Sequence, residues 1–121
     1  LAYESVLGAG AVVVFDRSRD VIDAMFRNAE FLAAESCGRC TPCRDGCEAM
    51  LEILGRLNRG EGAEEDIGAL EDLSQVMASS AMCGLGQTAV LPLMDTLKYF
   101  RKDYENRIGQ SEYFRALRAK A

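Results

Sequence analysis

The chain of 121 residues contains no histidine, and no apolar run in it approaches the roughly 20 residues that a membrane-spanning helix requires. The missing histidine excludes a histidine general base, a histidine-activated nucleophile and a histidine-ligated zinc ion. The missing apolar run predicts that the chain does not insert directly into a membrane. Any chemistry of this chain must therefore depend on other side chains.

The N-terminus also lacks an initiator methionine and a basic segment ahead of an apolar stretch, so it does not resemble a signal peptide. The length suits one compact domain with a modest core and is too short to hold a dinucleotide-binding α/β domain as well. Because the chain enters a strand-like run almost at once, we expect it to be a piece of something longer. We expect a cytoplasmic location, either soluble or peripheral within a complex.

Basic residues do not dominate: 14 Lys and Arg stand against 19 Asp and Glu, which gives a net charge of -5. Phosphate binding needs a basic surface, so nucleic acid is disfavoured as a partner. The charge is uneven, since residues 1–97 hold 7 basic and 16 acidic side chains and residues 98–121 hold 7 and 3. The acidic part predicts a soluble surface or a contact face, and the basic end is either solvated or docks on an acidic neighbour.

The five cysteines of the chain are unusual in their number and spacing. Its five cysteines are an odd number, which fits a fully paired disulfide scaffold poorly. Four of them fall within the eleven residues 37–47. In a cytosolic chain this density indicates metal binding or redox chemistry.

Hydrophobic periodicity predicts a mainly α, four-helix-bundle-like domain with one short N-terminal strand. The β-branched run 11–15 has strand length, and Gly8-Ala9-Gly10 before it is expected to be a turn, since a nucleotide-binding loop needs a third glycine between strand and helix. A first helix is expected from a cap at Asp20 into the cysteine segment, and a second from an N-cap at Thr41, with Pro42 in its first turn, to Gly60. A third is expected over about 66–79. A fourth begins near Thr88, with Pro92 in its first turn, and a short helix over about 112–118 closes the chain.

The apolar faces of these helices are expected to form the core, with most methionines packed there. The predicted core residues are Val21, Ile22, Met25, Phe26, Ala29, Leu32, Ala33, Cys47, Met50, Leu51, Leu54, Leu57, Ile67, Leu70, Leu73, Val76, Met77, Leu93, Met94, Leu97, Phe100 and Tyr104. We divide the chain into a lead-in from a preceding domain over residues 1–16, a helical metal-binding domain over 17–108, and a basic tail or short helix over 109–121.

The spacing of the first three cysteines, Cys37-x2-Cys40-x2-Cys43, suits three corners of a [4Fe–4S] cluster, in which each iron takes one thiolate. Three thiolates so close together cannot all bind one small tetrahedral ion without straining the loop. Backbone amides near the sulfurs favour the added negative charge of the reduced cluster. The residues expected around the cluster are Gly38, Arg39, Arg44, Gly84, Leu85 and Gly86, with simple surface exposure as the alternative for the two arginines.

Two cysteines compete as the fourth ligand. Cys47 continues the run into C-x2-C-x2-C-x3-C, as in bacterial ferredoxins, but there the fourth cysteine precedes a proline and ligates a second cluster. Here Glu48 follows, a second cysteine run is missing, and Cys47 would lie a full turn inside a helix. Cys83 lies instead in an expected tight turn, Cys83-Gly84-Leu85-Gly86. The predicted ligands are therefore Cys37, Cys40, Cys43 and Cys83, with Cys47 as a buried neighbour or an alternative ligand.

Two other types of chemistry remain open. Structural zinc usually takes two separated C-x2-C pairs, whereas here a triple precedes one distant cysteine. Thiol–disulfide exchange through C-x-x-C lacks the strand-to-helix setting of a thioredoxin-like fold. The spacing favours an iron–sulfur cluster over both.

Two segments closely resemble a known family. Residues 35–46, ESCGRCTPCRDG, resemble a signature of the NADH-binding flavoprotein subunits, the 51-kDa type of respiratory complex I and its relatives in NAD(P)-linked hydrogenases and formate dehydrogenases. Residues 80–89, SAMCGLGQTA, resemble the fourth-ligand turn of the same family. Together with LKYFR at 97–101, this turn looks more like the soluble hydrogenase-type members, and residues 8–14 resemble the segment that leads into the domain.

The resemblance implies a C-terminal helical-bundle domain with one [4Fe–4S] cluster, preceded by a domain of the same subunit that binds FMN and NAD(P). It implies that the cluster accepts single electrons from the flavin, or returns them, and relays them to further clusters in other iron–sulfur subunits. In that family the turn corresponding to Gly84-Leu85 lies near the flavin. Cys47 departs from the family pattern, in which a small polar residue is usual.

The expected function is that of an electron-transfer module, because nothing in this chain supplies substrate chemistry. It would be enzymatic only as part of an NAD(P)H-oxidising complex, most similar to an NAD(P)-linked hydrogenase. The same module in a formate dehydrogenase or complex I is the nearest alternative. A structural zinc-binding interaction domain is the alternative from another class.

Overall fold

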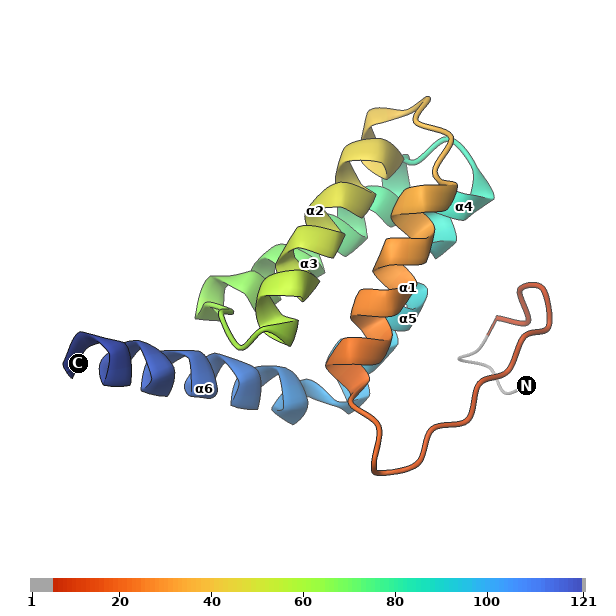
Figure 1. Cartoon of the computed structure of the whole chain (residues 1–121). Helices are drawn as coiled ribbons and strands as arrows, with labels where there is room; N and C mark the ends of the chain where they lie inside the picture. Colours follow the sequence, from red (N-terminus) through yellow and green to blue (C-terminus); the bar gives the residue numbers. More distant parts are fainter. Residues whose placement is uncertain (1–5, 121) are drawn as a thin grey trace.

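The computed structural model describes residues 6–120, apart from the side chains of residues 109–115 and 117–119. Over this range the chain forms six helices, namely α1 (Val21–Glu35), α2 (Thr41–Asn58), α3 (Glu64–Ser80), α4 (Gly84–Thr88), α5 (Leu91–Tyr99) and α6 (Arg101–Lys120). Helices α1 and α2 run antiparallel, α3 and α5 lie behind them, and α6 crosses one end of the bundle (Figure 1). The mainly α prediction is confirmed.

The first helix begins where the sequence predicts. The carboxylate of Asp20 accepts a hydrogen bond of 2.8 Å from the backbone N–H of Ile22, which satisfies one of the free donors of the first turn. Ile22 and Ala29 on the inner face of α1 are fully buried. The cap and the apolar face together fix where α1 starts and which side it turns toward α2.

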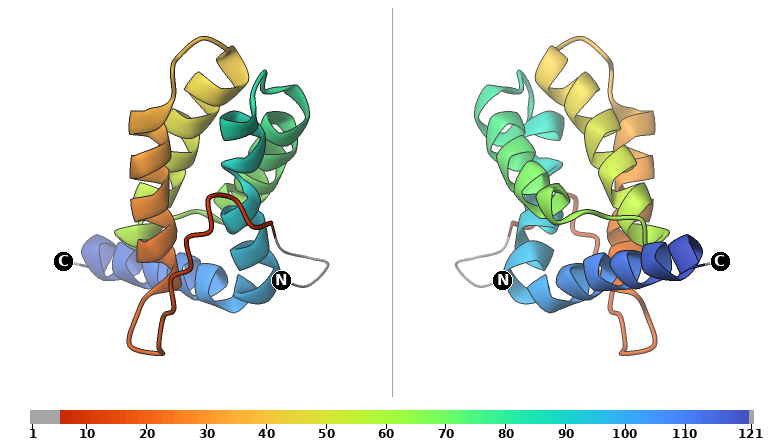
Figure 2. Two further views of the ribbon diagram at one scale, coloured as in Figure 1. Left: turned by 90° about the vertical axis from the view of Figure 1, so that its right-hand side faces the viewer. Right: turned by 90° about the vertical axis from the view of Figure 1, so that its left-hand side faces the viewer.

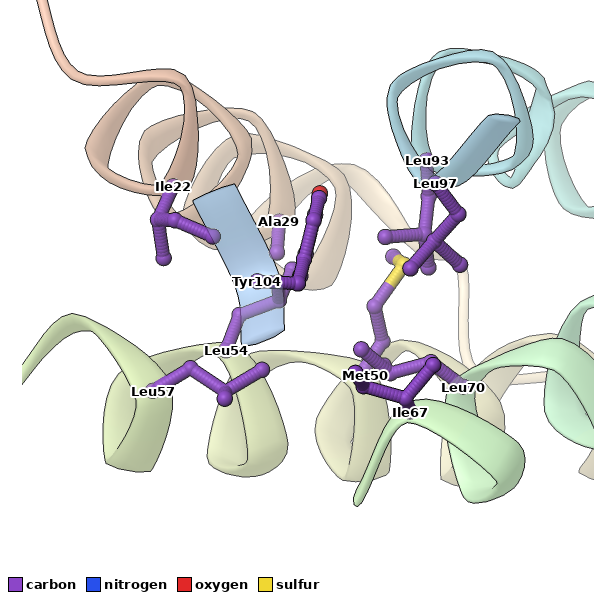
Figure 3. Close-up of a cluster of buried hydrophobic side chains, with 10 residues drawn as sticks. All are labelled: Ile22, Ala29, Met50, Leu54, Leu57, Ile67, Leu70, Leu93, Leu97 and Tyr104. Atoms are coloured by element: carbon purple, nitrogen blue, oxygen red, sulfur yellow. The ribbon is translucent and has the colours of Figure 1, made fainter. Parts of the chain in front are cut away.

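The main core lies between α1, α2, α3, α5 and the start of α6 (Figure 3). Its buried members are Ile22, Ala29, Met50, Leu54, Leu57, Ile67, Leu70, Leu93, Leu97 and Tyr104. Each large apolar side chain of this kind stabilises the fold by about 1.5–3 kcal/mol when it leaves water. In Figure 3 the ring of Tyr104 lies between Ile22 and Ala29 of α1 and Leu54 of α2.

Helix α6 is held to the bundle by its first two turns. The hydroxyl groups of Tyr104 and Thr96 lie 2.8 Å apart, and Arg107 pairs with Asp20 and donates to the carbonyl of Asn58 at 3.2 Å. The closing helix expected over about 112–118 therefore begins much earlier, at Arg101. The sequence of α6 is polar on average and carries little periodic apolar signal, so the pattern does not mark where this helix begins.

The N-terminal segment is the clearest difference from the expected elements. Residues 11–15 form no strand in the described chain, and Val12 and Val14 are 82% and 89% exposed. A strand needs a neighbour for its backbone hydrogen bonds, and this segment runs apart from the bundle (Figure 2). The turn before it is confirmed, since the N–H of Gly10 donates to the carbonyl of Leu7 at 2.9 Å and Gly10 has a φ of 83°.

Some predicted core positions are wrong. Val76 is 54% exposed, and Ser74 is fully buried instead, its hydroxyl donating to the carbonyl of Leu70 at 2.7 Å. Because its hydroxyl is hydrogen-bonded within its own helix, Ser74 can be buried without the free-energy cost of an unpaired polar group. A pattern of apolar residues does not identify such a position. Met94 and Phe100 are 41% and 47% exposed.

Helix boundaries around the glycines and prolines also shift. Cys40, rather than Thr41, occupies the N-cap of α2, with Pro42 in the first turn as expected. Cys83-Gly84-Leu85-Gly86 is the start of the short helix α4 rather than a tight turn, since neither glycine takes a positive φ. The next helix begins at Leu91 and ends at Tyr99, so Tyr104 belongs to α6.

Among the described residues, no helix has the length and apolarity needed to cross a bilayer.

Candidate metal centre

The two cysteine-bearing segments meet at one end of the bundle. Helices α2 and α3 have 18 and 17 residues and run antiparallel, so the start of α2 and the end of α3 lie at the same end. The α1–α2 loop and the α3–α4 connection both lie there, in all three views (Figures 1 and 2). We call residues 36–47 and 81–86 the cysteine end.

A backbone group of one segment lies against a sulfur of the other. The N–H of Met82 hydrogen-bonds the sulfur of Cys40 and, with a smaller contribution from the N–H of Cys43, lowers the pKa of the Cys40 thiol below its usual value. Hydrogen bonding to the charged form is the cause, since a thiolate gains more from an N–H donor than a thiol does. The residue before Cys83 thus reaches a predicted ligand of the first segment.

Gly86 makes a second direct approach between the segments. A Cβ atom built on Gly86 would lie 2.6 Å from the Cβ of Ala81, 2.9 Å from the Cβ of Cys43 and 3.3 Å from its sulfur. Only glycine allows the backbone of α4 to come this close to Cys43. Both Gly86 and Cys43 are buried, so the contact excludes water from that side of the sulfur.

Two polar side-chain groups surround the sulfur of Cys43. The hydroxyl oxygen of Ser36 lies 3.4 Å from it, and the sulfur of Cys47 lies 4.0 Å from it. The Ser36 oxygen also accepts the N–H of Gly38 at 3.3 Å, which leaves its hydroxyl hydrogen to point at Cys43. Gly38 has a φ of 74°, a backbone conformation that favours glycine.

Arg44 ties the loop of the first three cysteines to the start of α2. Its guanidinium donates to the carbonyl of Gly38 at 3.1 Å and to the hydroxyl of Thr41 at 3.5 Å. Its hydrogen bond with Asp45, at 2.8 Å, raises the pKa of Arg44 further above neutrality. Arg39, expected beside it, is exposed. Of the two arginines, it is therefore Arg44 whose contacts hold the loop in shape.

Cys47 is fully buried in a second apolar cluster at the cysteine end. The buried members of that cluster are Cys43, Cys47, Met77, Ala81, Ala89 and Val90. Burial, and then the neighbouring Cys43, raise the pKa of the Cys47 thiol to about 12. The predicted burial of Cys47 is confirmed.

The five cysteines are free and differ in their exposure: Cys37 and Cys83 are exposed, Cys40 is half-buried, and Cys43 and Cys47 are buried. Within the described part of the chain, no three Cys, Asp or Glu side chains gather closely enough to hold a single metal ion. A tetrahedral zinc ion needs four ligands at about 2.0–2.3 Å. A [4Fe–4S] cluster has a different requirement, because each of its irons takes one thiolate.

Sequence patterns missed three contributors to this site. They are the hydroxyl of Ser36, the backbone N–H of Met82, and Gln87, whose side chain donates to the carbonyl of Ala81 at 2.9 Å and so fixes the connection ahead of Cys83. Met82 itself is 80% exposed, so it acts through its backbone and not as a core side chain. Single polar residues such as these have no periodicity by which a sequence could mark them.

Grooves in the described surface lie away from these sulfurs. One is lined by Phe15, Asp20 and Met25 with Thr96 and Phe100, and another lies between α3 and α5 beside Glu71 and Lys98. None of the residues lining these two grooves belongs to the cysteine end.

Residues 23–107 match the family model described as the NADH-ubiquinone oxidoreductase-F iron-sulfur binding region. The chain is 36% identical, over 92% of its own length and 23% of the relative's, to the HndC subunit of an NADP-reducing hydrogenase from Solidesulfovibrio fructosivorans. It is 39% identical, over 88% and 24%, to the F 1 subunit of an NADH-quinone oxidoreductase from Rhizobium meliloti. It is 37% identical, over 87% and 21%, to the mitochondrial 51 kDa subunit of NADH-ubiquinone oxidoreductase from Neurospora crassa.

A solved structure is similar over most of the chain. It is the crystal structure of an NAD+-reducing [NiFe]-hydrogenase in the H2-reduced state, with a TM-score of 0.81 and 33% identity over 89% of this chain and 19% of that chain. The chain thus spans about a quarter or less of the length of the relatives it matches.

Proposed function

Because this chain belongs to the NADH-ubiquinone oxidoreductase-F iron-sulfur binding region family, we propose that it holds one [4Fe–4S] cluster and serves as an electron-transfer module of a larger oxidoreductase. The proposed ligands are the thiolates of Cys37, Cys40, Cys43 and Cys83. A bound cluster of this type supplies one-electron oxidation and reduction without breaking a bond.

The observation that carries the proposal is the close approach of Gly86 to Cys43, where a Cβ atom would lie 2.9 Å from the Cβ of Cys43 and 3.3 Å from its sulfur. It supports a single site, because it brings the segment of the first three cysteines against the segment that contains Cys83, about forty residues later. The lowered pKa of Cys40, whose first cause is the backbone N–H of Met82, agrees with this pairing.

The protein groups around these sulfurs have a common electrostatic role. Backbone N–H groups aimed at sulfur favour extra negative charge on the ligands, which supports acceptance of an electron. Arg44 adds a positive charge at the same loop and holds its shape through the Gly38 carbonyl. Burial of Cys43 limits the access of water on one side, while exposed Cys37 and Cys83 face the surface from which an electron can arrive or leave.

We further propose that this module exchanges single electrons with an FMN bound, together with NAD(P), in a preceding domain of the same subunit. Other iron–sulfur subunits of the complex would be its partners on the far side. The names of the relatives support two settings, an NAD(P)-linked hydrogenase and an NADH-quinone oxidoreductase, and the sequence identities of 36% and 39% are too similar to favour either. Residues 1–16 would lead in from the preceding domain, 17–108 would form the module, and 109–121 would follow it.

The test of the cluster is a metal analysis and an EPR spectrum of the anaerobically purified chain after reduction with dithionite. About four irons per chain with a fast-relaxing spin-half signal would support the proposal. About one zinc per chain and no signal would refute it and identify the structural zinc-binding domain instead.

A pair of variants tests the ligand set. Cys83→Ser is expected to lose the cluster or leave a three-iron form, and Cys47→Ser is expected to keep four irons, because the first removes a proposed ligand and the second a buried neighbour. An unchanged four-iron spectrum in Cys83→Ser would contradict the assignment of Cys83.

A further inference from the structure

The fifth cysteine contacts one proposed ligand and is not needed as a ligand itself. The sulfur of Cys47 lies 4.0 Å from that of Cys43, within reach of a sulfur hydrogen bond, and the geometry alone allows either sulfur to donate. The two residues are four positions apart in α2, so they lie one above the other on the same face of the helix. Both positions lie within α2, Cys43 in its first turn and Cys47 one turn further on, so the helix backbone sets the spacing of the two side chains.

Ligation of Cys43 decides the direction of this hydrogen bond. A sulfur bound to iron is a thiolate and has no proton, so it can only accept. Cys47 lies outside the proposed ligand set, so of the two sulfurs it is the one whose S–H hydrogen is not displaced by iron. Cys47 therefore becomes the donor, and Cys43 accepts from it as well as from the hydroxyl of Ser36.

No other partner competes for the Cys47 proton within the described surroundings of its side chain. The side chain is 0% exposed, so water does not reach it, and its neighbours Met77, Ala81 and Val90 are apolar at the contact. The only hydrogen bond of its sulfur among the described residues is the one to Cys43. A weak donor in such a dry place acts on its single acceptor with little screening.

We propose that Cys47 is a positioning residue that donates an S–H hydrogen bond to the iron-bound sulfur of Cys43 and thereby raises the reduction potential of the cluster. The inference rests on the proposed function. The reduced state places more negative charge on the thiolates, so a donor to one of them stabilises that state more than the oxidised state. If Cys47 were bound to iron instead, its sulfur would have no hydrogen to donate, so the donor role and the ligand role exclude each other.

The test is a redox titration of the reconstituted whole chain, followed by EPR, for wild type, Cys47→Ala and Val90→Ala. Cys47→Ala removes the donor and leaves a small cavity, whereas Val90→Ala leaves a cavity in the same apolar cluster and removes no polar group. We expect Cys47→Ala to keep its irons and to be reduced about fivefold less favourably, a shift of about 40 mV downward at 59 mV per tenfold for one electron. Val90→Ala is expected to keep the wild-type potential.

An infrared spectrum reports on the proton itself. With four cysteines ligated, one S–H stretching band should remain, it should vanish in Cys47→Ala, and it should move to lower frequency on reduction as the hydrogen bond strengthens.

Each other outcome refutes a distinct statement. If the wild type binds about four irons and Cys47→Ala has the same reduction potential, the donor role is refuted and the proposed function stands. A wild type without the S–H band, or a Cys47→Ala variant that loses iron, makes Cys47 a ligand and refutes the donor role. A wild type that binds no iron refutes the proposed function, and the inference falls with it.

Discussion

Substitution of Gly86 by alanine tests whether the close approach of α4 to α2 holds the cysteine end together. The new Cβ atom would meet the Cβ of Ala81 at 2.6 Å and the Cβ of Cys43 at 2.9 Å. Carbon atoms in contact normally lie about 3.5–4.0 Å apart, so α4 has to move away by about 1 Å. Neither obstacle is the end of a flexible side chain, since both atoms are fixed directly to the backbone.

The expected cost follows from two opposed effects. Overpacking of a tight interior site destabilises a protein by about 1–3 kcal/mol. Replacement of a helical glycine by alanine returns about 0.5–1 kcal/mol through the lower entropy of the unfolded chain. We therefore expect Gly86→Ala to lower the free energy of unfolding by about 1–2 kcal/mol.

Gly84, two positions earlier in the same short helix, is the matched control. Its Cβ would meet nothing within 4 Å, and its φ is not positive, so Gly84→Ala should be neutral or slightly stabilising. The assay is urea-induced unfolding of the metal-free chain followed by far-UV circular dichroism, with iron retention measured on the reconstituted forms. The reasoning fails if the two variants unfold at the same urea concentration.

Two further predictions concern the main core and the first helix. Burial raises the pKa of Tyr104 from 10.0 to about 12, so the folded state resists ionisation of this phenol. Its contribution to the free energy of unfolding is complete below pH 10, and about 2–3 kcal/mol is lost as the pH rises through 12. Urea unfolding of Tyr104→Phe should lack that loss. Asp20→Ala removes both the hydrogen bond to the Ile22 N–H and the ion pair with Arg107, and it should cost about 1–2 kcal/mol in the same assay. Asp20→Asn keeps the capping oxygen and should cost less than half as much; an equal cost in both variants would mean that the ion pair, and not the cap, stabilises this end of α1.

The parts of the fold that the sequence predicted well are those in which a local signal and a buried face agree. The Asp20 cap and the apolar spacing that follows it mark α1 without ambiguity. Val12 and its neighbours carry a strong strand signal, but strand formation needs a partner that a local pattern does not supply. The burial of Ser74 escapes prediction because its hydroxyl bonds within its own helix, which an alternation of apolar residues does not reveal.

The site divides in the same way. Cysteine spacing pointed to a metal centre and to the burial of Cys47, because sulfur chemistry restricts the number and order of ligands. The contacts that join the two segments, at Met82 and Gly86, depend on backbone positions forty residues apart in sequence. Such contacts follow from the antiparallel packing of α2 and α3, so they become visible only when the bundle is assembled.

The similar lengths of α2 and α3 have a consequence for how this chain acquires metal. Bringing two segments about forty residues apart into contact costs chain entropy, and here the packing of the main core, which lies outside the cysteine end, contributes to meeting that cost. Small zinc domains are the opposite case, since their ligands are gathered only when the ion binds and removal of the ion unfolds them. In this chain the antiparallel packing of α2 and α3 places the two cysteine segments at the same end of the bundle, so helix packing favours their approach as well as any bound metal does.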